Sequence, residues 1–456
     1  MYGRFARLGS TPVKLISAVR AFIAHRGPLF LINQLILAAL AAWLVSRIIG
    51  ANPDFERQYL HVRVVALGVV GIFGYLSLVL GRRGNARLPL FFAATCCAGE
   101  ILMRTVGPVG AGVNNDRPWR EPRPYFMFGG PSDGRAVNLL PAMDEGVGRP
   151  IRLNAEGFRI EREIVNPKPA DEVRIFVLGG STVLSGRRSE TTIPGVIEAQ
   201  LQANGLPRAR VYNFGVLNFV SGQELSLLVH RLIDMKPDLV IAYDGGNDVY
   251  EPWLYDPRPG YPFNYAAEEE AMAMLANGQG DAKTLAGFAR DSALVQAFLG
   301  TTDWFERVLM TIKRLRGTVS YGSPAWKEAV VNTYARNLTV MCRIARANGA
   351  SFAGFFQPLL AYSKLAGNQA AATGGDGLVR DLRDHRERAL RAVAARFPAP
   401  SVEAGCRFGD LSDVLENDAG AFTDAIHVDD KTNQLIGGRI AADLLAWPAL
   451  QAEHTK

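Results

Sequence analysis

Cysteine is scarce in this sequence, and its placement excludes two classes of protein. The 456 residues contain four cysteines, which are too few for a scaffold held together by disulfides. None belongs to a CxxC pair or to a Cys/His cluster with zinc-binding spacing, so we expect no metal site. Cys96 and Cys97 lie in an apolar run and are interpreted as packing residues. Cys342 and Cys406 could form one disulfide if their domain lies outside the cytoplasm.

The basic excess of the chain is small and local. The formal net charge is +6 at pH 7, and part of it comes from Arg4, Arg7, Lys14, Arg20 and Arg26. These cations flank an apolar stretch, which is typical of a membrane topology signal rather than of a nucleic-acid surface. With 48% hydrophobic and 21% charged residues, and no internal repeat, the chain suits one large domain and an appended segment.

Three apolar runs predict an N-terminal membrane anchor over residues 1–106. Each run is close to the length that crosses a bilayer as a helix, and the runs are residues 29–49, 64–80 and 88–106. The third is the weakest because it holds Glu100 and Arg104. A cleavable signal peptide is the alternative, but the first run begins late and two more follow it.

The number of spans decides where the rest of the chain lies. The basic N-terminus and the loop with Arg82, Arg83 and Arg87 belong in the cytoplasm. Three spans then place the following residues outside, in the periplasm of a Gram-negative source, whereas two spans leave them in the cytoplasm. We expect three spans, and therefore an inner-membrane protein with an extracytoplasmic catalytic domain.

The remaining sequence predicts an α/β domain. Residues 107–150, rich in glycine, proline and arginine, predict an irregular linker, and residues 151–456 predict the domain, with a long insertion at 249–324. The expected strands are 173–178, 211–214, 237–243 and 351–356, and the expected helices are 196–203, 225–233, 326–348, 379–396 and 434–445. Continuous apolar strands between amphipathic helices predict a parallel sheet covered on both faces, in three α/β/α layers.

A serine follows the first expected strand at a glycine turn. Residues 177–182 have the sequence VLGGST. The two glycines permit a sharp turn that presents Ser181 at the strand end, where such sheets bind their ligands. Gly-Gly-Ser is also an ordinary turn or phosphate-cradling sequence, but the glycine-lysine pair of a P-loop is missing.

Two further motifs end strands at the same edge. Gly215 closes the sequence NFG at 213–215, and Asn247 stands in DGGND at 244–248. A glycine N–H and a side-chain amide at this edge suit an oxyanion hole, whose donors stabilise negative charge in a transition state. Taken singly, both motifs are common turns.

A histidine with a nearby carboxylate precedes the last expected helix. Asp424 stands three residues before His427, so it can fold back within one turn and accept from the Nδ1–H of the ring. This contact leaves Nε2 free to face a serine. The other five histidines have no comparable strand-end setting.

In this order, the four motifs resemble the four blocks of the SGNH hydrolase superfamily, which includes the GDSL-like esterases. The resemblance covers roughly residues 150–447 and implies a flavodoxin-like fold. It implies Ser181 as nucleophile, His427 as general base and Asp424 as the partner of the base. It also implies an oxyanion hole made by the N–H groups of Ser181 and Gly215 and by the side chain of Asn247, with no cofactor.

The sequence departs from the family at one position. The commoner first block has aspartate before the serine, where this chain has Gly180. This weakens placement in the GDSL branch more than it weakens catalysis. The segment 154–159 (NAEGFR) resembles what precedes the first block in some secreted or membrane-bound members, and we interpret it as structural.

The resemblance implies an esterase that cleaves O-acyl, above all O-acetyl, esters through an acyl-enzyme, and the apolar runs at the N-terminus predict that it is anchored in a membrane. Trp253 and Tyr255 in the insertion could stack on sugar rings, so we expect an acylated surface polysaccharide or a glycolipid as substrate. The same aromatics could instead form the core of a cap. Two other functions stay open: an O-acyltransferase that passes the acyl group to a glycan hydroxyl, and an inactive binding module. No protein partner is indicated.

Overall fold

The computed structural model describes residues 121–132, 136–138, 150–263, 265–269, 301–364, 376–398 and 405–447, with single residues between 34 and 75. The chain divides into two compact units, Met1–Asp116 with Glu270–Arg307 and Arg117–Glu269 with Val308–Lys456. The insertion expected at 249–324 is therefore shared between them. The three expected membrane spans lie almost wholly outside the described residues. Within the described residues, no helix combines the length and apolarity needed to cross a membrane.

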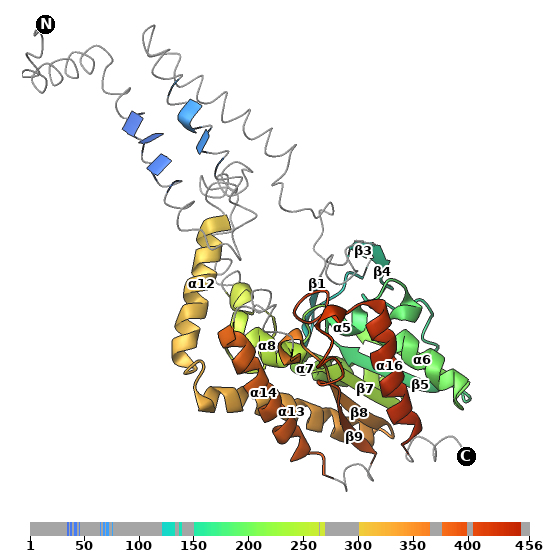
Figure 1. The fold of residues 1–456 in the computed structure, drawn as a ribbon. Helices are drawn as coiled ribbons and strands as arrows, with labels where there is room; N and C mark the ends of the chain where they lie inside the picture. The colour runs from blue at the N-terminus through green and yellow to red at the C-terminus, as the bar shows by residue number, and fades with distance from the viewer. Residues whose placement is uncertain are drawn as a thin grey trace, which may run out of the picture. The chain divides into compact units, whose positions relative to one another are not determined.

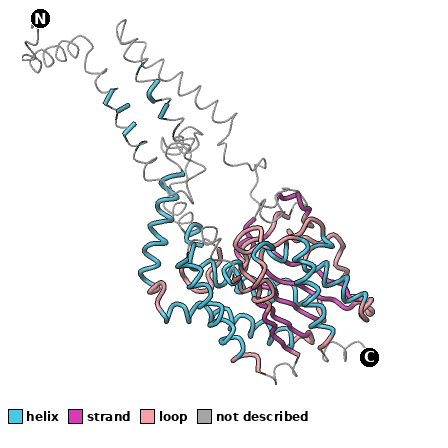
Figure 2. The backbone as a smooth tube through the Cα atoms, viewed as in Figure 1, coloured by secondary structure: helices cyan, strands magenta, loops and turns pink. Residues whose placement is uncertain are grey.

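A five-stranded sheet forms the centre of the second unit (Figures 1 and 2). Its order is β6-β5-β7-β8-β9, and every neighbouring pair is parallel. The strands are β5 (Val173–Gly179), β6 (Ala209–Gly215), β7 (Leu239–Asp244), β8 (Ser351–Phe356) and β9 (Cys406–Asp410). The predicted parallel sheet is thus confirmed, and the carboxyl ends of all five strands lie at one edge, as parallel pairing requires.

Helices cover both faces of the sheet. One face carries α6 (Ile193–Ala203) and α16 (Asp430–Leu445), and the other carries α7 (Ser221–Leu227), α13 (Pro324–Ala347) and α14 (Asp376–Ala394). Side chains alternate along each strand, so Ile175 and Val177 of β5 lie in the first core, whereas Phe176 and Leu178 lie in the second. This confirms the predicted three layers.

Short polar side chains begin the main helices. The Thr192 hydroxyl accepts from the N–H of Gly195 at the start of α6, and Asp429 Oδ1 accepts from the N–H of Thr432 at the start of α16, at 2.7 Å. A π-helical turn, Leu228–Leu232, follows α7. The other described helices are α5 (Ser181–Leu184), α8 (Gly246–Leu254) and α12 (Thr301–Thr318).

Two small antiparallel strand pairs begin in the segment expected to be an irregular linker. β1 (Glu121–Arg123) pairs with β2 (Met127–Gly129), and β3 (Ala136–Asn138) pairs with β4 (Pro150–Arg152). Phe126 and Phe128 pack in the core on the α7 side of the sheet, with ring centroids 6.1 Å and 5.7 Å from that of Phe219. This part of the segment is therefore ordered against the domain.

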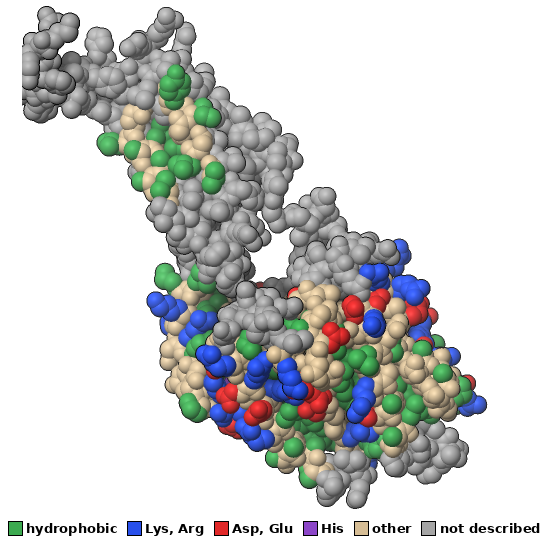
Figure 3. All heavy atoms as spheres, in the orientation of Figure 1, with side chains coloured by type: hydrophobic (Ala, Val, Ile, Leu, Met, Phe, Trp, Pro, Cys, Tyr) green, Lys and Arg blue, Asp and Glu red, His purple; other side chains and the backbone are tan. Residues whose placement is uncertain are grey.

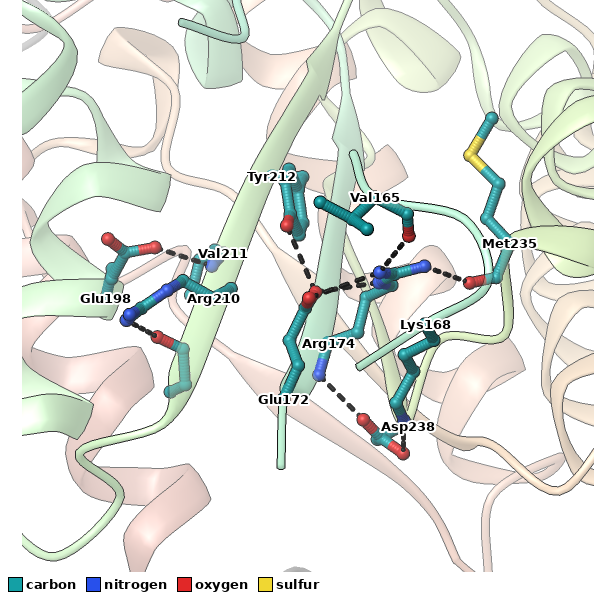
Figure 4. Close-up of polar contacts among 11 residues, drawn as sticks. Val165, Lys168, Glu172, Arg174, Glu198, Arg210, Val211, Tyr212, Met235 and Asp238 are labelled. Carbon is teal, nitrogen blue, oxygen red and sulfur yellow. Dashed lines mark hydrogen bonds and ion pairs between the residues drawn. The ribbon is translucent and has the colours of Figure 1, made fainter. Parts of the chain in front are cut away.

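A buried arginine lies at the amino end of the sheet, opposite the strand ends that carry the motifs (Figure 4). Arg174 of β5 is fully buried, and its guanidinium donates to the Glu172 carboxylate and to the carbonyl oxygens of Val165 and Met235. Its backbone N–H donates to Asp238 at 2.6 Å. The Glu172 carboxylate compensates the positive charge of Arg174, and the guanidinium is hydrogen-bonded. This buried cluster therefore stabilises the fold.

One disulfide and two ion pairs join α13 to its neighbours β9 and α14. Cys342 of α13 and Cys406 of β9 form a disulfide. Lys327 of α13 forms ion pairs with Asp381 and Asp384 of α14, at 2.7 Å and 3.2 Å. On the face seen in Figure 3, Lys and Arg side chains are interspersed with Asp and Glu side chains.

Candidate active site

The nucleophile candidate stands at the carboxyl end of the second strand in the sheet. Ser181 begins α5, two residues after β5 ends, and is 6% exposed. Gly180 between them has no room for a side chain, because a Cβ there would lie 2.6 Å from Asn247 Nδ2. The absence of a side chain at Gly180 therefore lets the Asn247 amide approach the serine turn.

Three side chains that the sequence nominated form one hydrogen-bonded chain. His427 Nε2 lies 2.8 Å from Ser181 Oγ, and His427 Nδ1 lies 2.7 Å from Asp424 Oδ2. With the Nδ1–H donating to the carboxylate, Nε2 carries a lone pair directed at the serine hydroxyl. The arrangement can remove a proton from Ser181 when its oxygen attacks an electrophile.

Asp424 is held in place by backbone donors. Its Oδ1 accepts from the N–H groups of Ile426 at 2.8 Å and His427 at 2.7 Å, which leaves Oδ2 for the imidazole. Burial acts to raise the pKa of Asp424, but the His427 ring and the two backbone N–H groups outweigh it and lower the pKa below its usual value. The carboxylate therefore stays ionised opposite the ring at neutral pH.

The amide of Asn247 faces the same turn from the next strand of the sheet. Asn247 is the second residue of α8, which follows β7, and its Nδ2 donates to the Phe219 carbonyl oxygen at 2.8 Å. A side-chain amide carries two N–H bonds, so one remains after this contact. This fixes the orientation of the amide beside Gly180.

The expectation for Gly215 is corrected by the structure. Its N–H already donates to Asn213 Oδ1 at 2.9 Å, so it is not free for an oxyanion. Gly215 is needed for packing instead, because a Cβ there would lie 2.7 Å from the Leu184 nitrogen and 2.8 Å from Val183 Cβ. The NFG motif lets α5 lie close against the end of β6.

The turn after Gly215 was missed in the sequence. The N–H of Phe219 donates to the Val216 carbonyl at 3.2 Å, and Asn218 within this turn has a left-handed backbone with φ of 59°. Asparagine tolerates this conformation better than most residues, which is the one signal the sequence offered. Within the described part of the chain, the Asn218 N–H has no hydrogen-bond partner.

Other residues hold α5 from behind. Arg159 is buried and its guanidinium donates to the carbonyl oxygens of Leu184 and Gly186, at 2.8 Å and 2.9 Å. Ser185 Oγ donates to the Ser181 carbonyl at 2.7 Å. These contacts satisfy carbonyl groups that a helix of one turn leaves unpaired, so the segment 154–159 has the structural role expected of it.

The two aromatic residues proposed to bind substrate lie in different surroundings. Trp253 is 6% exposed, its Nε1 donates to His385 Nδ1 at 3.2 Å, and its ring packs against Tyr321 and Trp326. Trp253 is therefore a core residue, which corrects its assignment as a substrate contact. Tyr255 is half-buried, with its ring centroid 4.7 Å from that of Phe263.

A second tyrosine, not foreseen, lies near both Tyr255 and the carboxylate of the site. Burial, and then the neighbouring Tyr255 and Asp424, raise the pKa of Tyr250 to about 12. Its hydroxyl therefore stays neutral at physiological pH. As for metals, the described ranges contain no group of three or more His, Cys, Asp or Glu side chains that could hold an ion.

Comparison with known proteins gives distant structural similarities only. No family model and no curated protein matches the sequence. An α/β hydrolase from the metagenome of Lake Arreo is 13% identical, with 61% of this chain and 96% of that one covered, and a TM-score of 0.34. An acetylxylan esterase from Geobacillus stearothermophilus is 12% identical, with 61% and 95% covered, and a TM-score of 0.34. Any assignment of function therefore depends on the site itself.

Proposed function

We propose that this protein is a serine ester hydrolase of the SGNH type. The observation that carries the proposal is the chain of contacts from Ser181 through His427 to Asp424, at 2.8 Å and 2.7 Å. Nucleophile, base and orienting carboxylate stand in the order and at the distances that nucleophilic catalysis requires. The nucleophile and the base both stand at the carboxyl edge of a parallel sheet, where such folds bind ligands.

The reaction proceeds in two steps. His427 Nε2 takes the hydroxyl proton as Ser181 Oγ attacks the carbonyl carbon of the ester, and the protonated ring then gives that proton to the departing alcohol as the ester C–O bond breaks. In the second step His427 deprotonates a water molecule as its oxygen attacks the acyl carbonyl carbon. The ring then returns that proton to Ser181 Oγ as the acyl C–O bond breaks, which releases the carboxylic acid and restores the free serine. Asp424 stabilises the charged ring in both steps without taking a proton.

Three donors supply the oxyanion hole in this proposal. They are the N–H of Ser181, the N–H of Asn218 and the remaining N–H of the Asn247 amide. Among the described residues neither backbone N–H has another partner, and the Asn247 amide donates to Phe219, the residue after Asn218. Asn218 replaces Gly215, whose N–H is occupied by Asn213. Each such donor typically contributes roughly 10²–10³-fold to turnover.

The substrate we propose is an O-acetyl or short O-acyl ester on a carbohydrate or glycolipid. Tyr255 neighbours Tyr250, which in turn lies near Asp424. Farther along the insertion, Tyr261 is 40% exposed, with the Arg258 guanidinium 3.9 Å from its ring centroid. Aromatic faces of this kind can stack on sugar rings. With Trp253 assigned to the core, Tyr255 and Tyr261 carry this part of the proposal.

We also propose that the catalytic domain lies outside the cytoplasm, attached to the inner membrane by residues 1–106. The disulfide between Cys342 and Cys406 supports an oxidising compartment. The test is fractionation followed by labelling of free thiols in intact cells. We expect detergent to extract the protein from membranes, and Cys342 and Cys406 to react with the label only after reduction. If these two cysteines react before reduction, the domain lies in the cytoplasm.

The experiment for the reaction uses the full chain in detergent, with p-nitrophenyl esters from acetate to octanoate and a chelator present. We expect hydrolysis that the chelator does not affect and that His427→Ala lowers to near background, with the fastest turnover for acetate. Adding acetylatable glycans distinguishes hydrolysis from transfer. If adding the glycan leads to acetylated glycan with little release of free acetate, the protein is an O-acyltransferase instead.

A further inference from the structure

Behind the candidate oxyanion hole, two short segments are held together by three hydrogen bonds. Asn247 Nδ2 donates to the Phe219 carbonyl at 2.8 Å. The next residue, Asp248, accepts from Ser221 twice: from its N–H to Oδ2 at 3.0 Å and from its hydroxyl to Oδ1 at 2.5 Å. Residues 247–248 are thus hydrogen-bonded to the segment 219–221, and we call this set of contacts the Asp248 clamp.

The Asp248 clamp is closed to solvent and anchored to a second helix. Asp248 is 5% exposed and Ser221 is fully buried. Asn337 of α13 donates through Nδ2 to the Ser221 hydroxyl oxygen at 3.0 Å, which fixes the direction of the hydroxyl proton toward Asp248. Both carboxylate oxygens of Asp248 are thereby used, and both bonds go to the first residue of α7.

The position of the clamp links two of the proposed donors. Asn218, with its left-handed backbone, is the residue before Phe219, and Asn247 is the residue before Asp248. The Asp248 carboxylate therefore fixes the distance between the Asn218 backbone N–H, which is one donor, and the Asn247 side-chain amide, which is the other. A preorganised donor must lie within a fraction of an ångström of its place, and a misplacement of about 1 Å can cost roughly 10²-fold in rate.

We propose that Asp248 is a positioning residue that sets the spacing between the Asn218 N–H and the Asn247 amide, an inference that rests on the proposed esterase function. Asp248 touches neither the ester nor the reacting atoms. Its effect is on the transition state, because the donors it aligns bind the negative oxygen more strongly than the neutral carbonyl of the substrate.

Nearby buried acids offer a matched control. Asp244 at the end of β7 accepts from the Tyr334 hydroxyl at 2.7 Å and lies beside the buried carboxyl group of Glu224. Tyr334 is as buried as Ser221 and donates to a carboxylate four residues before Asp248, but it forms no hydrogen bond with the described residues of the clamp. Tyr334→Phe thus removes a buried hydrogen bond of the same kind and leaves the clamp intact.

The test compares full-length Asp248→Ala, Asp248→Asn, Ser221→Ala and Tyr334→Phe with the wild type. We expect Asp248→Ala to lower kcat for p-nitrophenyl acetate by roughly 10²-fold with KM nearly unchanged. We also expect it to weaken binding of a boronic acid, which mimics the tetrahedral oxyanion, by a similar factor. Asp248→Asn keeps one acceptor for the Ser221 N–H and should recover most of kcat. Ser221→Ala should fall between them, and Tyr334→Phe should stay within a few-fold of the wild type.

Several results would overturn the inference. One is an Asp248→Ala variant with wild-type kcat and boronic acid affinity. Another is equal losses of kcat in Asp248→Ala and Tyr334→Phe, which would indicate general destabilisation. If Asp248→Ala does not fold, Ser221→Ala decides through its boronic acid affinity. A crystal structure of Asp248→Ala supplies a readout independent of activity, since an unchanged contact between Asn247 and Phe219 would also refute the inference. A wild type that neither hydrolyses esters nor binds the boronic acid refutes the esterase proposal instead.

Discussion

The imidazole of His427 lies 2.8 Å from the hydroxyl of Ser181, although the two residues are 246 positions apart in the sequence. The contact is possible because β5 presents Ser181 at the carboxyl edge of the sheet, and the chain reaches the same edge again just before α16. Asp424 lies on that returning segment and holds the ring from its other side. The geometry leads to the following expectations.

Asn247→Ala should lower kcat by roughly 10²–10³-fold, because it removes one donor from the proposed oxyanion hole and frees the Phe219 carbonyl. KM and the melting temperature should change little by comparison. Steady-state kinetics with p-nitrophenyl acetate measures the first effect, and thermal unfolding the second. Normal turnover in a folded variant would remove Asn247 from the mechanism.

Gly180→Ala should reduce kcat at least about tenfold, since the new Cβ would lie 2.6 Å from Asn247 Nδ2 and displace the amide. Gly438→Ala in α16 is the matched control, because a Cβ there meets nothing within 4 Å. That control should keep full activity and gain slightly in stability, as alanine favours a helix over glycine. Equal kinetics in the two variants would show that the bare Cα of Gly180 has no part in the site.

The fold was more predictable than the site. The run at 351–356 coincides with β8 because it is continuously apolar and bounded by a glycine and a proline. The last helix begins at Asp430, four residues earlier than expected, since Asp429 caps it with a side-chain acceptor. β9 was missed because Cys406–Asp410 is short and mixes charged with apolar residues, and only its pairing with β8 makes it a strand.

Within the site, local sequence signals nominated single residues but could not give their orientation. Ser181, His427 and Asp424, which the structure brings together, were nominated because each stands next to a recognisable turn or strand end. The error at Gly215 arose because the sequence does not show that the Asn213 side chain folds back onto that N–H. Trp253 was misassigned for a similar reason, since Tyr321, Trp326 and His385, which bury it, are distant in sequence.

The buried acids predict how stability depends on pH. Burial, and then the nearby Asp248, raise the pKa of Asp244 to about 7, and burial together with Asp244 raises that of Glu224 well above its usual value. In the unfolded chain both would lose their protons near pH 4. Their contribution to the free energy of unfolding is therefore complete below about pH 4 and is lost as the pH rises through 7 and above.

Glu224→Gln should flatten this dependence, because an amide at this position does not titrate and can donate to the neighbouring Asp244 at any pH. We expect the melting temperature of the wild type to fall more steeply than that of the variant between pH 5.5 and 8.5. Thermal unfolding across that range measures both slopes. Parallel curves would mean that the Glu224–Asp244 pair is not protonated in the folded protein.

Reduction of the disulfide should lower stability without stopping catalysis. The bridge joins residues 64 positions apart, and the chain-entropy relation for a loop of that length gives about 4 kcal/mol. Cys342→Ser with Cys406→Ser should therefore unfold at a clearly lower urea concentration, while kcat at 25 °C in the folded protein stays close to that of the wild type. A loss of kcat with unchanged stability would show instead that the bridge acts on the site.

The most direct test of the account is covalent trapping of the nucleophile. The full-length wild type, Ser181→Ala and His427→Ala are treated with a fluorophosphonate, and the labelled residue is identified by peptide mass spectrometry. The account predicts a single label on Ser181 in the wild type, none in Ser181→Ala, and labelling slowed by orders of magnitude in His427→Ala. A folded wild type that remains unlabelled, or a label that persists in Ser181→Ala, would contradict the assignment of Ser181 as an activated nucleophile.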